Sequence, residues 1–407
     1  MRSDLSTGER IAAWRVYRGM TQEACAGLVG KSLSWWKKVE AGVRHVEKLT
    51  DLITIGQVLR VSDLADLTGV ARFSLAVDSS GEHPMLPPVK AAFNAIPPTT
   101  GGEPPDRVNL RHRLDAGWHV WHTSAHFHSR VGEFVPALVQ DAERLLFVPP
   151  PDRRDAYRLR ADCYGLVRGW LRKVCAYDLA RIAAERQLQS ALRADDPVRT
   201  GLAAFGLTGV LTHQSPEEGL EVSMGAIRML DRRVDADTSD GRDGLGVWGA
   251  LNLSASIAAA RSGEDGRAWG FLDRAQDAAS TLGPDYWCPA TVFGHANVSA
   301  YAVAVPVELG KSRDAVTAAE RRFDPTALPS VERRARSLVD VARGYAARRD
   351  DVAAIKFFEM AVRESAEEVR SCLVAHSTIQ EMLRRDKRAI SQELRALARQ
   401  VGVLEST

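Results

Sequence analysis

The side chains best suited to specific chemistry lie in the segment 21–42, TQEACAGLVGKSLSWWKKVEAG. Trp36 and Val39 are three residues apart, so they predict the apolar face of a short helix. The other side of that helix presents Leu33, Ser34, Lys37 and Lys38. Hydroxyl and ammonium groups donate hydrogen bonds to base edges and to phosphate oxygens, which makes this surface a candidate for contact with nucleic acid.

Local signals around this helix predict two short helices joined by a tight turn. Thr21 is suited to the N-cap of the first helix, and Gly30 ends it. Ser32 or Ser34 then caps the second helix, which closes at Gly42. This arrangement is typical of a helix-turn-helix, whose second helix lies in the DNA major groove.

The segment resembles the Xre/Cro/phage-repressor family of helix-turn-helix domains. The residues that support the resemblance are Met20-Thr21-Gln22, Ala24, Gly30, the Trp36/Val39 pair and Glu40-Ala41-Gly42. The family implies one helix before the motif, over 8–18, and two after it, over 48–59 and 62–67. It also implies contact with double-stranded DNA by Gln22, Ser32, Leu33, Ser34, Trp35, Lys37, Lys38 and Arg44.

Trp35 departs from the family pattern, which usually has a small polar residue there. Its indole either presses on the sugar-phosphate backbone or covers the next helix. The charge of the segment 31–48 favours DNA: it holds five basic and two acidic residues, whereas the whole chain of 407 residues holds 54 and 52. The alternative is a small protein-binding module whose basic helix is merely solvated.

A second group of residues could hold a metal ion. His119, His122 and His126 have spacings of three and four, which puts them on one side of a helix, and His128 follows. No acidic or cysteine ligand is close in sequence, and three interleaved aromatic residues favour a packed interface: Trp118, Trp121 and Phe127. We therefore expect no metal and no cofactor.

The rest of the composition argues against catalysis and against a membrane. The chain has no glycine-rich phosphate loop, nucleophile elbow or HExxH segment, so we expect no enzyme. Its five cysteines are scattered without a CxxC spacing, which suits reduced thiols. No apolar run is long enough to span a bilayer, and we expect a cytoplasmic protein.

Three regions follow from the distribution of helix breakers. Residues 1–72 form the predicted DNA-binding domain. Residues 73–108 are rich in proline and glycine and predict a linker with one short helix over 89–94. From 109 to 405 helical patterns follow one another without period-two strands.

Long helices, short polar turns and second helices recur in this last region about every 40 to 50 residues, the period of stacked helical hairpins. Such arrays resemble degenerate tetratricopeptide (TPR) repeats, as in GHANVSAYAVAVPVELG and ALPSVERRARSLVDVARGYAARRD. With the Xre-type head, the chain resembles the long actinobacterial Xre-TPR regulators and, in architecture, peptide-pheromone regulators. The expected fold is all-α, a five-helix Xre-type domain followed by an α-solenoid of TPR-like hairpins.

The inner face of such a solenoid is lined by the first helix of each hairpin. Asparagine is a poor helix former, so Asn252 and Asn297 within apolar helices suggest a polar partner. In pheromone regulators, asparagines on this face hold a peptide backbone. The candidate effector site consists of these two residues with aromatic walls: Trp248, Asn252, Tyr286, Trp287, Asn297 and Tyr301. The alternative is that each asparagine bonds a neighbouring loop and the aromatic residues are hairpin core.

The resulting hypothesis is a sequence-specific DNA-binding transcriptional regulator, expected to be a homodimer, whose TPR-like region dimerises, senses a peptide or small-molecule effector, or both. The alternative is a non-enzymatic adaptor whose solenoid binds a protein partner. The response of operator binding to changes at Ser34 or Lys38 distinguishes the two.

Overall fold

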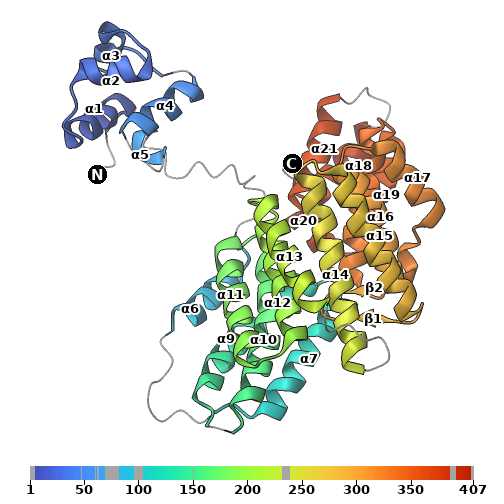
Figure 1. The fold of residues 1–407 in the computed structure, drawn as a ribbon. Helices are drawn as coiled ribbons and strands as arrows, with labels where there is room; N and C mark the ends of the chain where they lie inside the picture. Colours follow the sequence, from blue (N-terminus) through green and yellow to red (C-terminus); the bar gives the residue numbers. More distant parts are fainter. Residues whose placement is uncertain are drawn as a thin grey trace. The chain divides into compact units, whose positions relative to one another are not determined.

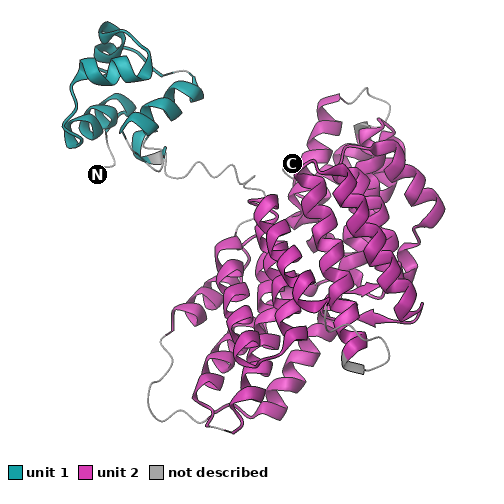
Figure 2. Cartoon of the chain, viewed as in Figure 1, with its two compact units in different colours: residues 1–79 teal, residues 80–407 magenta. Residues whose placement is uncertain are grey.

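The computed structural model describes residues 5–46, 48–59, 61, 64–68, 82–95, 104–149, 151–231, 239–385 and 391–404. The chain divides into two compact units, Met1–Ser79 and Ser80–Thr407 (Figure 2). Both units are built from helices, as the sequence predicts, and each is described separately below.

The first unit contains five helices around a small apolar core. They are α1 Thr7–Tyr17, α2 Gln22–Val29, α3 Leu33–Glu40, α4 Leu49–Leu59 and α5 Ala65–Thr68 (Figure 1). The side chains that pack together inside it are fully buried and come from α1, α2, α3, α4 and α5: Ile11, Cys25, Trp36, Ile55, Leu59 and Leu67. Trp36 is the largest of them, so α3 is anchored through its apolar face.

The ends of α2 and α3 are set by the caps that the sequence predicts. The Thr21 hydroxyl accepts a hydrogen bond from the amide of Ala24 at 3.1 Å. Gly30 closes α2 with a φ of 71°, a left-handed conformation that costs glycine little. Of the two serines that could cap α3, Ser32 does so, accepting from the amide of Trp35 at 3.1 Å. The turn between the helices is therefore specified locally.

The second unit is a succession of helices with one short β-ribbon. Its elements in chain order are α6 Leu86–Asn94, α7 Arg107–Thr123, α8 Phe127–Gly132, α9 Val135–Arg144, η1 Leu145–Phe147, α10 Arg153–Lys173, α11 Tyr177–Arg193, α12 Pro197–Leu211, α13 Pro216–Leu230, α14 Ser239–Arg261, α15 Asp265–Leu282, β1 Trp287–Cys288, β2 Phe293–Gly294, α16 His295–Glu308, α17 Ser312–Arg322, η2 Pro325–Ala327, α18 Val331–Ala347, α19 Asp351–Glu364, α20 Ala366–Ser371, α21 Leu373–Arg385 and α22 Ser391–Gln400. None of the helices within the described residues is long and apolar enough to cross a membrane.

Consecutive helices pack as antiparallel hairpins, which confirms the predicted repeat architecture. Five of the three-residue connections between described helices have a middle residue with a positive φ, between 48° and 75°. These middle residues are Cys175, Asp195, Gly263, Gly310 and Arg349. A single left-handed residue reverses the chain in a short loop, so the same connection recurs although its residue type varies.

The β-ribbon between α15 and α16 is absent from the sequence prediction. Trp287 pairs with Gly294 and Cys288 with Phe293 in antiparallel register. Strands of two residues are too short to show a period of two in the sequence, so this element had no readable pattern.

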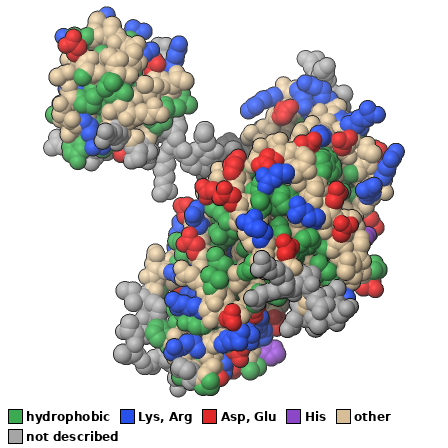
Figure 3. All heavy atoms as spheres, in the orientation of Figure 1, with side chains coloured by type: hydrophobic (Ala, Val, Ile, Leu, Met, Phe, Trp, Pro, Cys, Tyr) green, Lys and Arg blue, Asp and Glu red, His purple; other side chains and the backbone are tan. Residues whose placement is uncertain are grey.

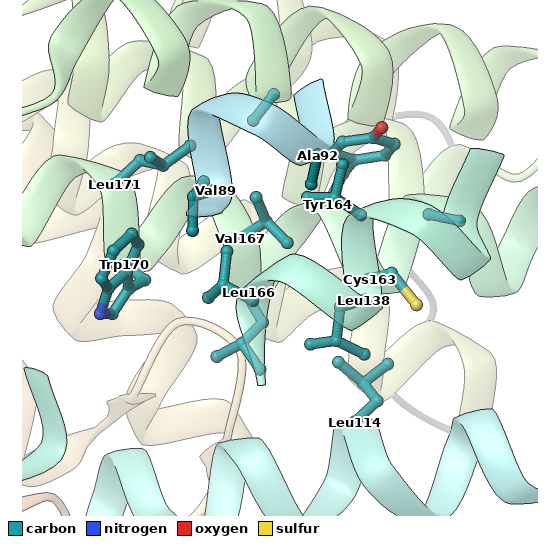
Figure 4. Close-up of a cluster of buried hydrophobic side chains, with 14 of the residues drawn as sticks. Val89, Ala92, Leu114, Leu138, Cys163, Tyr164, Leu166, Val167, Trp170 and Leu171 are labelled. Carbon is teal, nitrogen blue, oxygen red and sulfur yellow. The ribbon is translucent and has the colours of Figure 1, made fainter. Parts of the chain in front are cut away.

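The helix expected within the linker packs on the second unit. Leu86, Val89, Ala92 and Phe93 of α6 are buried in the same core cluster as Tyr164 and Trp170 of α10. Figure 4 shows Val89 and Ala92 beside residues of α10. Of the rest of the expected linker, 73–81 and 96–103 lie outside the described residues.

Early and late helices of the second unit meet through a buried polar network. The Lys173 ammonium at the end of α10 donates to Glu332 of α18 and, at 2.6 Å, to Glu368 of α20. His128 of α8 lies 3.1 Å from the Glu368 carboxylate. A second contact joins the same regions, since the Ser365 hydroxyl donates to the Ala125 carbonyl at 2.7 Å. We call Lys173, Glu332, Glu368 and His128 the closure network.

The charge pairs of the closure network keep its buried carboxyl groups ionised. Burial alone would raise the pKa of the Glu332 and Glu368 carboxyl groups, but the Lys173 ammonium outweighs it and holds both pKa values below the ordinary 4.5. Carboxyl groups with lowered pKa values stabilise the fold above pH 4.5, and that contribution is lost as the pH falls through their folded values.

Replacing the shared cation tests the closure network. Lys173→Met leaves two buried carboxylates without their cation. We therefore expect the free energy of unfolding of the second unit to fall by about 3–5 kcal/mol at pH 7. The loss should shrink at acid pH, because the wild type loses the contribution of both carboxylates as the pH falls from 4.5 through their lowered folded pKa values. Urea denaturation of the full-length protein followed by circular dichroism measures it. Lys356→Met, on the exposed side of α19, is the matched control and should change little; equal stability of both variants would contradict the network's role.

Candidate nucleic-acid interface and interior hollow

The polar face of α3 is free for a partner. Ser34, Lys37 and Lys38 are exposed, while Trp36 and Val39 on the opposite face are buried. Leu33 is half-buried at the start of the helix and shares a shallow surface depression with these polar residues. The helix therefore presents donors outward from a backbone that the core holds in place.

The cations of this face are not neutralised by the protein itself. Lys37, Lys38 and Arg44 form no ion pair with any described residue, and all three are exposed. Lys31, by contrast, pairs with Asp51 of α4 at 3.0 Å. The unpaired positive charge is thus concentrated on α3 and the turn after it, as phosphate contact requires.

Gln22, at the start of α2, is engaged within the first unit, and its contact with DNA stays a prediction. Its side-chain amide donates to Glu40 at 2.7 Å, and Glu40 also accepts from Arg15 at 2.6 Å and from the Trp36 indole at 2.6 Å. A nearly buried carboxylate needs donors, and Gln22 at the start of α2 is within reach. In this structure Gln22 holds α2 to the end of α3 and does not present a free amide.

Trp35 follows the second of its two predicted alternatives. Its ring is partly buried against the core of the first unit, and the Lys31 ammonium lies 5.4 Å from the ring centroid. Because Lys31 pairs with α4, the indole covers the junction between α3 and α4. Whether its outer edge also touches DNA stays a prediction.

The C-terminal end of α3 is held closely by α1. A side chain at Gly8 would collide with the carbonyl oxygen of Val39, so only glycine allows this approach. Together with the Arg15 to Glu40 ion pair, this contact fixes the angle at which α3 leaves the domain.

The Glu40 network gives a measurable pH dependence. Burial alone would raise the pKa of Glu40, but hydrogen bonds from Arg15, Gln22 and Trp36 outweigh it and hold that pKa below 4.5. Glu40→Gln should therefore cost about 1.5–3 kcal/mol at pH 7. The difference should vanish as the pH falls below 4.5 and Glu40 becomes protonated in the wild type.

Tryptophan fluorescence during urea denaturation of the full-length protein measures this difference, since Trp36 is buried in the same unit. Glu23→Gln, on the exposed side of α2, is the control that loses the same charge. A Glu40→Gln protein with wild-type stability at pH 7 would show that the network does not hold α3.

The second unit encloses a set of adjoining hollows on its inner side, which we call the interior hollow. The largest has a volume of about 650 Å³ and opens between α7, α10, α12, α14 and the β1–β2 connection. Two smaller hollows of about 130 and 140 Å³ continue it toward α16 and α18. The first helices of five hairpins thus line the hollow, as expected for a solenoid.

Three of the six candidate effector residues line the interior hollow. Tyr286 and Trp287 stand at its largest part, and Tyr301 lines the smaller two. Asn297 is buried, and its side-chain oxygen accepts from Arg333 at 2.6 Å. Its polar partner is therefore Arg333 of the helix α18, and not the neighbouring loop of the alternative interpretation.

Asn252 and Trp248 do not line the hollow. Asn252 is fully buried and donates to the Trp248 carbonyl at 2.9 Å within its own helix. The Trp248 indole donates to Asp231 at 2.6 Å. The face of α14 that meets the hollow carries Ser254, Ile257 and Arg261 instead, because the packing of α13 and α15 turns the Asn252 face into the core.

Of the histidines that could have held a metal ion, His122 and His128 belong to contacts between helices, while His119 of α7 is exposed. His122 lies 3.0 Å from the hydroxyl of Ser330 and stacks on Trp118. His128 belongs to the closure network. Within the described ranges, no group of three or more histidine, cysteine or acidic side chains is arranged to hold a metal ion.

Sequence reasoning missed the cations of the interior hollow. Arg168 and Arg172 of α10 and Arg333 of α18 line it, beside Trp118 of α7. The only sequence signal of Arg168 and Arg172 is arginine at a spacing of four in the otherwise apolar segment 163–172, and a solvated helix face would show the same signal.

Comparison with known proteins agrees with the geometry of the first unit. Residues 7–68 match the family described as "Helix-turn-helix domain". The N-terminal unit is a helix-turn-helix domain. The match spans α1 to α5 and leaves the second unit outside it.

The whole chain has a weaker structural likeness. It aligns with the crystal structure of Bacillus thuringiensis PlcR in complex with the peptide PapR7 and DNA, at 9% identity and a TM-score of 0.33. The alignment covers 88% of this chain and 99% of that chain. A TM-score this low supports no argument about this protein. No curated protein matches the chain.

Proposed function

We propose that this protein is a sequence-specific, Xre-type transcriptional regulator in the cytoplasm that binds DNA as a homodimer and responds to a peptide or small molecule. The observation that supports this proposal most directly is the α3 face of the helix-turn-helix domain. Ser34, Lys37 and Lys38 are exposed and unpaired there, on a helix held by Trp36.

The expected docking follows from that face. α3 enters the major groove, where Ser34 and Lys38 meet base edges, and Arg44 in the next turn contacts the backbone. One such helix reads only a few base pairs, so strong specificity needs two heads. Two half-sites about 34 Å, or one helical turn, apart would then mirror the twofold axis of a dimer.

The interior hollow supports the sensing part of the proposal. Its main volume of about 650 Å³ lies in the range of small-molecule pockets, roughly 300–1,000 Å³. An occupant of the main volume would touch α7, α10, α12 and α14 at once, so it favours one curvature of the solenoid over others. An occupant can shift the equilibrium between two curvatures only by the difference between its binding free energies for them.

Selection of genomic fragments by the purified full-length protein tests DNA recognition. We expect a compact palindromic motif that Lys37→Ala/Lys38→Ala loses. If both lysines contact phosphates, the slope of log affinity against log salt should fall by about 0.9 for each one removed. If Lys38 contacts a base, Lys38→Ala alone should weaken operator binding by about 1–3 kcal/mol.

The control for this experiment is Lys356→Ala, an exposed lysine of α19 in the other unit. It should select the wild-type motif with the wild-type salt dependence. Weak, salt-sensitive binding without any motif by the wild type would reject a sequence-specific regulator. That outcome would favour an adaptor that uses the solenoid for a protein partner.

The dimer is tested separately by light scattering of the purified protein. We expect a mass of twice 44.5 kDa, both free and on a palindromic site. A protein with the mass of a single chain on DNA that still selects a palindrome would contradict the dimer while leaving DNA recognition intact.

A further inference from the structure

Two arginines of α10 point into the interior hollow without a partner. Arg168 is 6% exposed, and Arg172, four residues later on the same face, is half-buried. The Nε atoms of both are buried and make no hydrogen bond, and neither guanidinium forms an ion pair with any residue that the structure describes. They line the same small hollow.

The other cations around the hollow are all engaged. Their pairs are Lys173 with Glu332 and Glu368, Arg261 with Glu308 at 3.0 Å, Arg333 with Asn297 at 2.6 Å, Arg336 with Asp340 at 3.6 Å, and Arg199 with Asp162 at 2.9 Å. Glu332 lines the same small hollow as Arg168 and Arg172, and Lys173 already occupies its carboxylate. The wider hollow holds further carboxylates, of Asp115, Asp162, Asp243, Glu308 and Asp340, but none forms an ion pair with either arginine among the described residues. Each of these other cations thus has a hydrogen-bonding or ionic partner, and Arg168 and Arg172 differ from them in having none among the described residues.

An unpaired buried charge destabilises a fold unless something outside the protein completes it. Burial, and then the neighbouring charge of Arg172, lower the pKa of Arg168 to about 9, so the group still carries its proton at neutral pH. The local potential is positive. Burial first, and then Arg172 and Arg261 among other cations, lower the pKa of His213 to about 3 and keep that ring neutral.

α12 leaves room for the Arg168 side chain. A side chain at Gly206 would collide with the Arg168 guanidinium, and Gly209, three residues later, lies opposite the Nε atom of Arg172. Glycine within a helix costs about 1 kcal/mol relative to alanine. Gly206 therefore leaves room for the Arg168 guanidinium that a larger residue would displace, whereas at Gly209 a side chain would only touch Arg172.

The remaining walls of this hollow include four aromatic side chains, of Trp118, Trp121, Phe205 and Tyr301. Trp118, Phe205 and Tyr301 line it together with the arginine pair, and Ser254 adds a hydroxyl. On the face of the second unit that Figure 3 shows, by contrast, Lys and Arg side chains lie among Asp and Glu side chains. The interior combines unpaired positive charge with aromatic surface, and the visible exterior mixes both signs of charge.

We propose that Arg168 and Arg172 bind the oxyanion of the effector, a carboxylate or a phosphate group, while its apolar part lies against Trp118, Phe205 and Tyr301. The proposal rests on the proposed effector-sensing function and names the chemistry of the ligand. Guanidinium forks donate two parallel hydrogen bonds to such groups, and a pair of forks can hold one anion from two sides. The anion removes the repulsion between the two arginines.

The site adjoins the closure network. Lys173 follows Arg172 directly, and Arg333, which lines the same hollow, follows Glu332. An anion bound between α10 and α18 would change the distance between these two helices, which the contact of Lys173 with Glu332 joins. Occupancy would thus change the curvature of the body, which is the property that the proposed regulator requires.

Thermal unfolding of the full-length protein with benzoate, inorganic phosphate or pyrophosphate tests the site, at an ionic strength held constant with sodium chloride. We expect a saturable rise in melting temperature with benzoate if the natural group is a carboxylate, or with the phosphates if it is a phosphate. Arg168→Met/Arg172→Met should abolish the rise. In the absence of anions this variant should melt no lower than the wild type, because it loses a buried repulsion.

Two further variants sharpen the result. Arg168→Lys/Arg172→Lys keeps both charges but loses the two-pronged hydrogen bonding of the guanidinium groups. It should raise the half-saturating anion concentration by about tenfold or more. Arg181→Met/Arg363→Met removes two exposed charges and should respond to the probes as the wild type does. No saturable rise with any probe, a rise that survives in Arg168→Met/Arg172→Met, or a lower melting temperature of that variant without anions would overturn the proposal.

Operator selection by the same proteins separates this proposal from the proposed function. A wild type that selects a palindrome but shows no anion-dependent rise rejects the oxyanion site alone. A wild type that gains stability from an anion but selects no motif rejects the regulator, and the anion site then stands without its proposed use.

Discussion

The shape of the second unit depends on one buried ammonium group. Lys173 joins carboxylates that are 159 and 195 residues further along the chain, and through them it brings α10 against α18 and α20. A stack of hairpins contacts only its neighbours by default, and its two ends are free to separate. A charged contact between early and late helices removes that freedom, because neither partner tolerates burial without the other. The interior hollow exists because the stack closes in this way.

The first unit is also held together by a buried charged group that binds partners from several helices. Glu40 at the end of α3 collects donors from α1, α2 and α3 itself. The recognition helix is held by a buried carboxylate on its inner side and by Trp36 in the core, so its outer side can consist of exposed, unpaired donors. In both units, satisfied buried charge fixes the backbone, and unsatisfied charge marks the surface available to a partner. On α3 that surface is open to solvent; on α10 it lies within the hollow.

Sequence reasoning succeeded where the signal is local. The caps Thr21 and Ser32, the break at Gly30 and the hairpins of the body depend on residues within one or two turns, and each is where the pattern predicts it. It failed for side chains whose surroundings depend on packing. Asn252 was assigned to the inner face, yet it is fully buried and does not line the hollow. The hydrogen bond from Gln22 to Glu40 was not foreseen either. A shift of one residue around a helix turns its face by about 100°, so a correct helix can still present the wrong side chains.

By itself the sequence determined a largely helical chain, a helix-turn-helix whose basic helix is capped by Ser32 or Ser34, and a second unit of repeated hairpins. These follow from spacing, caps and turns, which act within short stretches of chain. Only the tertiary structure decided which helices meet across the hollow, which charges find partners and which do not. Arg168 and Arg172 look like any solvated pair in the sequence; they become distinctive because they lie in an interior where every neighbouring cation is already engaged. Whether a charge is paired is a property of residues far apart in the chain, so no local pattern reports it.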